Sequence, residues 1–156
     1  MSTKHRSGPR KAFTLIEVLI VVVIMAILAA VIIPQFSSAT SDAKRSTLEF
    51  NTHTLRSQIE LYRVHHGSYP TISNGDLPQL WQATNAAGDI GTPGPSYPYG
   101  PYLATGIPAN PYNNSNRVVA VATPGQRPTA VVAGGAGWQY DETTGNIYPN
   151  NPEYFQ

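Results

Sequence analysis

Hydrophobic residues form one long block near the start of the chain. Between Phe13 and Ile33 the only formally charged residue is Glu17. As an α-helix rising ~1.5 Å per residue, this block would be roughly 32 Å long. That length matches the hydrocarbon core of a bilayer, which is about 30 Å thick. The pattern therefore predicts a transmembrane helix over residues 13–33.

The twelve residues in front of this block carry only positive charge. Lys4, Arg6, Arg10 and Lys11 lie there, and no acidic residue does. Because basic flanks stay on the cytoplasmic side of a membrane, we expect a single-pass protein with its N-terminus inside. The part beyond residue 33 would then lie on the far side of the membrane.

Glu17 is the unusual residue of the block. A carboxylate costs about 2.5–3.5 kcal/mol at the centre of a bilayer, and less near its edge, so Glu17 needs a cationic partner or a function. If the chain is cut after Ala12, Phe13 acquires an α-amine, with a pKa of about 7.7–8.0. That amine could pair with Glu17 of a neighbouring copy. One acid and one amine per subunit would then set the register of a helical stack.

At these residues the sequence resembles the type IV pilins and the type II secretion pseudopilins. Their signature is a short basic leader, a small residue, a segment like Phe13-Thr14-Leu15-Ile16-Glu17, and about twenty apolar residues. The resemblance implies a leader peptide at residues 1–12, cleavage between Ala12 and Phe13 by prepilin peptidase, and N-methylation of Phe13. It also implies polymerisation through residues 13–33, with Glu17 as the assembly residue. The family usually has glycine before the cut, whereas this chain has Ala12. Because alanine is also small, we expect cleavage to occur, at a slower rate than with glycine.

The resemblance also implies partners and a location. The partners would be further copies in a helical filament, other pseudopilins or minor pilins, prepilin peptidase, an inner-membrane assembly platform, and membrane lipid before assembly. The subunit would span the inner membrane once, with a periplasmic C-terminal domain.

Residues 34–66 show a second, amphipathic pattern. Apolar and small residues recur there at steps of four and three, which places them on one helical face: Leu48, Thr52, Leu55, Ile59 and Tyr62. Pro34 removes one backbone hydrogen bond, so we expect a helix kink there; the alternative is that the helix ends at Pro34. Gly67 and Pro70 would end the helix near His66.

The rest of the chain contains two regions that differ in amino-acid composition. Residues 67–116 are rich in proline and glycine, which predicts an irregular loop region with one short helical turn at residues 77–81. Residues 117–156 form a C-terminal β region, with expected strands at residues 118–121, 129–132, 138–140 and 146–148 and a hairpin loop at residues 141–145. The predicted fold class is α+β: a long N-terminal helix whose amphipathic half packs on a small antiparallel sheet.

Two segments of the loop region extend the resemblance to the major pseudopilins. His66-Gly67-Ser68-Tyr69-Pro70 is similar to the family's helix-closing segment. The family's Gly-Pro-Tyr-Leu and Pro-x-Asp-Pro-aromatic segments are similar to residues 100–103 and 108–112.

Composition narrows the function classes. The chain has ten Lys and Arg residues and nine Asp and Glu residues; removing the four leader cations leaves six against nine, a side-chain charge of −3. A mildly acidic mature chain is a poor nucleic-acid binder, so no nucleic-acid partner is expected.

The chain has no cysteine, whereas several major pilins close their C-terminal region with a disulfide. This favours a secretion pseudopilin over a motility, adhesion or DNA-uptake pilin.

No catalytic or metal-binding pattern stands out, so we expect neither an enzyme nor a cofactor. His65 and His66 are adjacent, and adjacent side chains on a helix point apart. The family's major pseudopilins can bind calcium in a C-terminal loop. Asp141, Glu142, Thr143 and Asn146 offer oxygen ligands, but their spacing fits no calcium signature and no ligand is assigned.

Other readings of the N-terminus remain open. A secretory signal peptide cut after residues 37–39 would release a soluble, β-rich ligand-binding domain starting at Thr40. An uncut anchor would tether such a domain, or a hydrolase, to the membrane.

Overall fold

The structure, a computed structural model, describes residues 13–155, apart from the side chains of residues 33–38. The chain divides into two compact units, Met1–Ser41 and Asp42–Gln156. One helix, α1 (Leu15–His66), passes through both. Its predicted end is confirmed, because Gly67 has a φ of 73° and donates its N–H to the Arg63 carbonyl at 2.8 Å. This is the left-handed closure that favours glycine after a helix.

Helix α1 is continuous across Pro34. The alternative that the helix ends at this proline is therefore wrong. Proline removes one hydrogen bond from a helix but leaves the neighbouring turns intact, which is why the helix can continue. The kink at Pro34 stays a prediction. Residues 37–39, the candidate signal-peptidase site, also lie within the helix.

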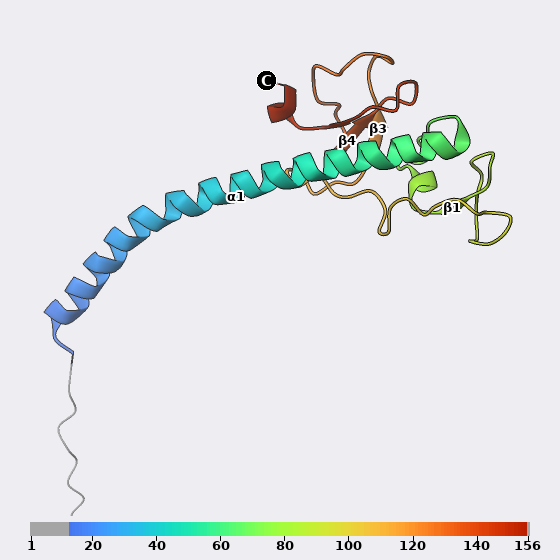
Figure 1. Cartoon of the computed structure of the whole chain (residues 1–156). Helices are drawn as coiled ribbons and strands as arrows, with labels where there is room; N and C mark the ends of the chain where they lie inside the picture. The colour runs from blue at the N-terminus through green and yellow to red at the C-terminus, as the bar shows by residue number, and fades with distance from the viewer. Residues whose placement is uncertain (1–12, 156) are drawn as a thin grey trace, which may run out of the picture. The chain divides into compact units, whose positions relative to one another are not determined.

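The second unit has a three-stranded sheet with the order β3 (Val118–Ala120), β4 (Trp138–Tyr140) and β5 (Ile147–Pro149). β4 and β5 form the predicted antiparallel hairpin, with Tyr140 opposite Ile147. β3 and β4 lie beside the C-terminal half of α1, the green segment of Figure 1. The α+β class is confirmed.

Two details of the predicted sheet are wrong. β3 and β4 are parallel, with Val118 opposite Trp138, so the sheet is mixed rather than antiparallel. The β-branched segment 129–132 is not a strand, and residues 129–131 are exposed. Strand propensity is realised only where a partner strand and a buried face are available, and here neither is.

The hydrophobic core lies between α1 and the sheet. All five residues of the predicted stripe are buried: Leu48, Thr52, Leu55, Ile59 and Tyr62. The apolar members pack with Trp138, Tyr140 and Ile147 in one cluster. Full burial of such a side chain contributes about 1.5–3 kcal/mol, so this contact holds the amphipathic half of the helix on the sheet.

The loop region folds onto the end of α1. The predicted helical turn is confirmed as the 3₁₀-helix η1 (Pro78–Leu80). A short two-stranded sheet, β1 (Ala83–Thr84) with β2 (Ile90–Gly91), was not expected from the sequence. His66 contacts the Thr84 hydroxyl at 3.1 Å, which places β1 beside the last turn of α1 (Figure 1). A second 3₁₀-helix, η2 (Pro152–Phe155), ends the described chain.

The β4–β5 hairpin depends on Gly145. Its φ is 71°, and a Cβ added there would overlap the ring of Tyr69. We expect Gly145→Ala to lower the free energy of unfolding by about 3 kcal/mol, from backbone strain and forced repacking. Gly134→Ala is the control, since its φ is also positive but a Cβ would meet nothing within 4 Å; it should cost about 1 kcal/mol. Equal losses in chemical denaturation would contradict the role given to Tyr69.

Candidate assembly site

The first unit presents an apolar helical surface that nothing else in the described chain covers. The segment Leu15–Ile32 has a mean hydropathy of 3.3, and none of its residues is buried. By length and composition it could cross a membrane; a signal sequence would meet the same criterion. Side chains as large as Phe13 and Leu15 are 86% and 85% exposed. Burial of this surface requires lipid or another protein chain.

The Glu17 side chain is hydrogen-bonded to Thr14 at the N-terminus of its own helix, α1. Its Oε2 atom accepts hydrogen bonds from the Thr14 N–H and the Thr14 hydroxyl, both at 2.8 Å. In return, the Glu17 N–H donates to Thr14 Oγ1 at 3.3 Å. This is a capping box, in which the N-cap residue and the third helical residue satisfy each other's backbone donors. Its sequence signal is Thr-x-x-Glu before an apolar run, and it was not among the features predicted from the sequence.

The capping box leaves Glu17 on an open apolar face. Phe13, Glu17, Val18, Val21 and Val22 line a shallow surface groove of about 340 Å³. Phe13, which precedes the N-cap Thr14, and Glu17 therefore line the same groove. Ala12, the other half of the predicted cleavage site, lies outside the described residues.

His65 and His66 meet at the Tyr102 hydroxyl at the end of α1, so the expectation that their side chains point apart is wrong. His65 Nδ1 and His66 Nε2 lie 2.9 Å and 3.1 Å from the Tyr102 hydroxyl, and the His66 ring lies 4.1 Å from the Tyr62 ring. Within residues 13–155, no three His, Cys, Asp or Glu side chains gather closely enough to hold a metal ion. These contacts pin the loop region to the helix.

The candidate calcium ligands at the hairpin have other partners. Asp141 is 2% exposed and accepts hydrogen bonds from the Thr143 N–H, the Thr143 and Thr144 hydroxyls, and the Gly125 N–H. Glu142 accepts from the Ile72 N–H. A calcium ion needs six to eight oxygen ligands. Here both carboxylates already accept hydrogen bonds from backbone and hydroxyl groups. The hairpin residues therefore do not fit a calcium site.

Asp141 should make stability depend on pH. Burial raises its pKa, but the hydrogen bonds from Thr143, Thr144 and Gly125 outweigh burial and lower the pKa from 3.8 to about 2. Since the folded-state pKa is depressed, the stabilisation is full above about pH 4 and is lost as the pH falls towards 2. We expect Asp141→Asn to cost about 2 kcal/mol at pH 7 and little at pH 2.

The test compares denaturation curves of Asp141→Asn at several pH values with those of Asp42→Asn, which removes an exposed carboxylate. The Asp42 variant should follow the parent chain throughout. A loss at Asp141 that stays constant from pH 7 to pH 2 would contradict the assignment.

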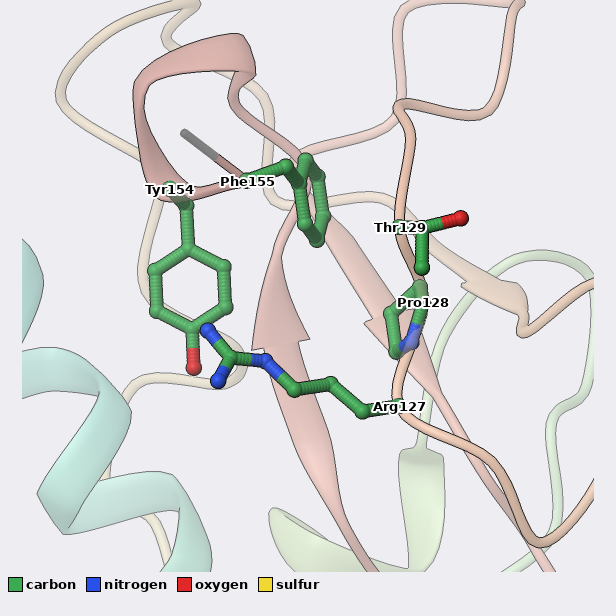
Figure 2. Close-up of a pocket in the computed structure, with 5 residues that line it drawn as sticks. All are labelled: Arg127, Pro128, Thr129, Tyr154 and Phe155. Atoms are coloured by element: carbon green, nitrogen blue, oxygen red, sulfur yellow. The ribbon is translucent and has the colours of Figure 1, made fainter.

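A pocket of about 320 Å³ lies between η2 and the loop before β4. It is lined by Arg127, Pro128, Thr129, Tyr154 and Phe155 (Figure 2). The Arg127 guanidinium lies over the Tyr154 ring, 5.0 Å from its centre, as expected for a cation–π contact. The lining residues include no histidine, carboxylate or serine that could act as an acid, base or nucleophile.

Comparisons with known proteins agree with this arrangement. Residues 8–33 match the family profile of the prokaryotic N-terminal methylation motif, and residues 35–146 match that of type II secretion system, protein G. The chain is 29% identical to type II secretion system core protein G of Pseudomonas aeruginosa, over 80% of this chain and 81% of that protein. It is 30% identical to the Aeromonas hydrophila protein of the same name, over 81% and 79% of the two chains.

A shorter similarity lies outside that group. Over 62 residues the chain is 37% identical to a fimbrial protein of Neisseria meningitidis, covering 40% of this chain and 36% of that protein. No solved structure gives a significant match. The profile of type II secretion system, protein G, covers most of the chain and begins two residues after the methylation-motif match ends, so this chain belongs to the protein G family of type II secretion pseudopilins.

Proposed function

We propose that the chain is the repeating subunit of a pilus-like filament in a type II secretion system. Prepilin peptidase cuts it between Ala12 and Phe13, and Phe13 is then N-methylated. Before assembly the subunit lies in the inner membrane, with its N-terminus on the cytoplasmic side and its second unit in the periplasm. An assembly platform then extracts it into the filament, together with other pseudopilins.

One observation carries this proposal: an exposed apolar helix that bears a single carboxylate at its start. The surface of Leu15–Ile32 suits lipid before assembly and neighbouring helices afterwards. Glu17 lines the same surface groove as Phe13, whose α-amine is free once the leader is removed. In the single subunit the Thr14 hydrogen bonds satisfy the carboxylate. In the filament, the amine of a neighbouring subunit replaces or joins them, which neutralises both charges.

The predicted processing has a direct test. We expect the intact mass and the N-terminal residue of the protein, extracted from native membranes, to correspond to a chain that starts at N-methylated Phe13. A chain starting at Thr40 would indicate a signal peptide and a released β-rich domain. An intact Met1 would indicate a simple anchor. Either result would overturn the proposal.

Ala12 allows a finer experiment on processing. Replacing it with glycine, the usual residue of the family at this position, should speed the conversion of precursor to mature chain in a pulse-chase measurement. Ala12→Leu should block conversion, because a large side chain replaces a small one beside the cut bond. Equal conversion of all three chains would contradict the assigned cleavage site.

A further inference from the structure

The loop between β3 and β4 is long and irregular. It runs over residues 121–137, from the end of β3 at Ala120 to the start of β4 at Trp138. Because β3 and β4 are parallel, the chain must cross back over the sheet, which is usually done by a helix. An irregular crossover of this length needs anchors of its own.

Asn150 supplies the central anchor. It is 7% exposed, and its Oδ1 atom accepts from the Val132 N–H at 2.8 Å. Its Nδ2 atom donates to the Val132 carbonyl and the Ala136 carbonyl, both at 2.9 Å. The side-chain amide thus pairs with both backbone groups of Val132, as a neighbouring strand would.

Three further amides extend this anchor. Gln139, which is fully buried in β4, donates from Nε2 to the Ala130 carbonyl at 2.8 Å and to Asn150 Oδ1 at 2.9 Å. Asn113 donates to the Ala136 carbonyl, and Asn110 to the Gly137 carbonyl, each at 2.9 Å. Four carbonyl oxygens of the loop, those of residues 130, 132, 136 and 137, therefore already accept amide hydrogens.

The charges of this loop also disfavour a cation. Residues 121–137 contain no Asp or Glu, and their one charged residue is Arg127, whose guanidinium rests on Tyr154 (Figure 2). Among the described residues, Gln139 Oε1 is the buried side-chain atom without a hydrogen-bond partner. One neutral oxygen is far from the six to eight ligands of a calcium site, in which carboxylates usually take part.

We propose that the amides of Asn110, Asn113, Gln139 and Asn150 close this loop by themselves, and that neither it nor the β4–β5 hairpin takes the calcium ion that the resemblance implies for a C-terminal loop. The subunit then folds, and keeps the loop ordered, without a divalent cation. The proposal concerns the second unit and holds whether or not the chain forms a filament.

The first test uses the unmodified mature chain in detergent, with about 5 mM calcium or with a chelator. This concentration exceeds the roughly 10⁻³ M dissociation constants of weak extracellular calcium sites. We expect the same Tm, the same hydrogen-exchange rate of the peptide covering residues 121–137, and no binding heat in titration calorimetry. A higher Tm or slower exchange of that peptide in calcium, together with binding heat, would overturn the proposal.

The second test removes the central amide. Asn150→Ala should speed amide exchange in residues 121–137 by about tenfold or more, because it leaves both backbone groups of Val132 without partners. Calcium should not restore the slow rate. The matched control is Asn146→Ala, whose side chain is exposed and bonds only to Thr144; this loop should not respond to it.

Unchanged exchange in Asn150→Ala would overturn the proposal, as would rescue by calcium. If this variant does not fold, Asn113→Ala removes one hydrogen bond to the loop, that to the Ala136 carbonyl, and one outside it, that from the Ser115 N–H. Within residues 121–137 it should speed exchange around residue 136 alone. The calcium comparison on the unmodified chain decides the question in either case.

Discussion

Glu17→Gln is expected to abolish filament assembly while leaving processing and folding intact. The substitution removes the one negative charge of the apolar segment and so leaves a neighbour's α-amine without its partner. Breaking a buried ion pair by removing one member typically costs about 3–5 kcal/mol. This corresponds to a fall of two to four orders of magnitude in the association constant for each subunit added. Sheared-filament yield, measured beside membrane-bound subunit, checks the prediction.

Glutamine is the informative substitution because it separates the two roles of Glu17. A Gln side chain can still accept from the Thr14 N–H, and the capping box is satisfied by Glu or Gln alike. The variant therefore keeps the helix cap and loses only the charge. If filaments form at the parental level, Glu17 is a cap and the charge-pairing mechanism is wrong.

Thr14→Ser is the matched control for this experiment. Serine keeps a hydroxyl at the N-cap, so the hydrogen bonds to Glu17 and the charge should both persist. We expect parental filament yield. A loss in this variant would mean that the Thr14 methyl group, rather than the charge of Glu17, contributes to the subunit contact.

Trp138→Ala is expected to unfold the second unit. Trp138 is fully buried in β4, and its Nε1 atom donates to the Pro108 carbonyl at 2.8 Å. Truncating a buried tryptophan costs about 3–5 kcal/mol, and the orphaned carbonyl adds to this loss. Small domains have only about 5–15 kcal/mol of stability in total. Chemical denaturation of the full chain, followed by near-ultraviolet circular dichroism, checks the prediction.

Trp81 provides the comparison for Trp138. It is 37% exposed and donates from Nε1 to Asp76 Oδ2 at 3.0 Å. Trp81→Ala should cost about 1 kcal/mol, because most of the loss is one partly solvated hydrogen bond. If the two substitutions destabilise equally, Trp138 is not the centre of the contact between β4 and α1.

Trp138→Phe separates volume from hydrogen bonding. Phenylalanine keeps most of the apolar volume within the core cluster that contains Leu55 and Ile59 but removes the donor to Pro108. We expect a loss intermediate between the parent chain and the alanine variant. A loss as large as that of alanine would mean that the hydrogen bond, rather than packing, dominates at this position.

The N-terminal half of the fold could be predicted because its signals are local. A run of apolar residues with one carboxylate predicts a long helix without any knowledge of distant residues. The same is true of the stripe from Leu48 to Tyr62 and of the stop at Gly67. Each depends on helix periodicity or on the conformation of one residue.

The capping box shows that a local signal can still be overlooked. Thr14-x-x-Glu17 is a complete sequence signature, and it predicts a partner for the carboxylate within the helix itself, whereas the cost of a charge in a membrane predicts a partner on another chain. The structure shows that the same side chain has a partner within its own first turn.

Local patterns along the chain were enough to predict the long helix, its apolar and amphipathic halves, and the hairpin around Gly145. They did not predict that β3 runs parallel to β4, that residues 129–132 stay outside the sheet, or that Gln139 and Asn150 are buried. These features depend on contacts between residues that are far apart in the sequence. Strand pairing and the burial of an amide depend on partners far along the chain, such as Asn113 with Ala136, and no periodicity in a short window records which groups will meet.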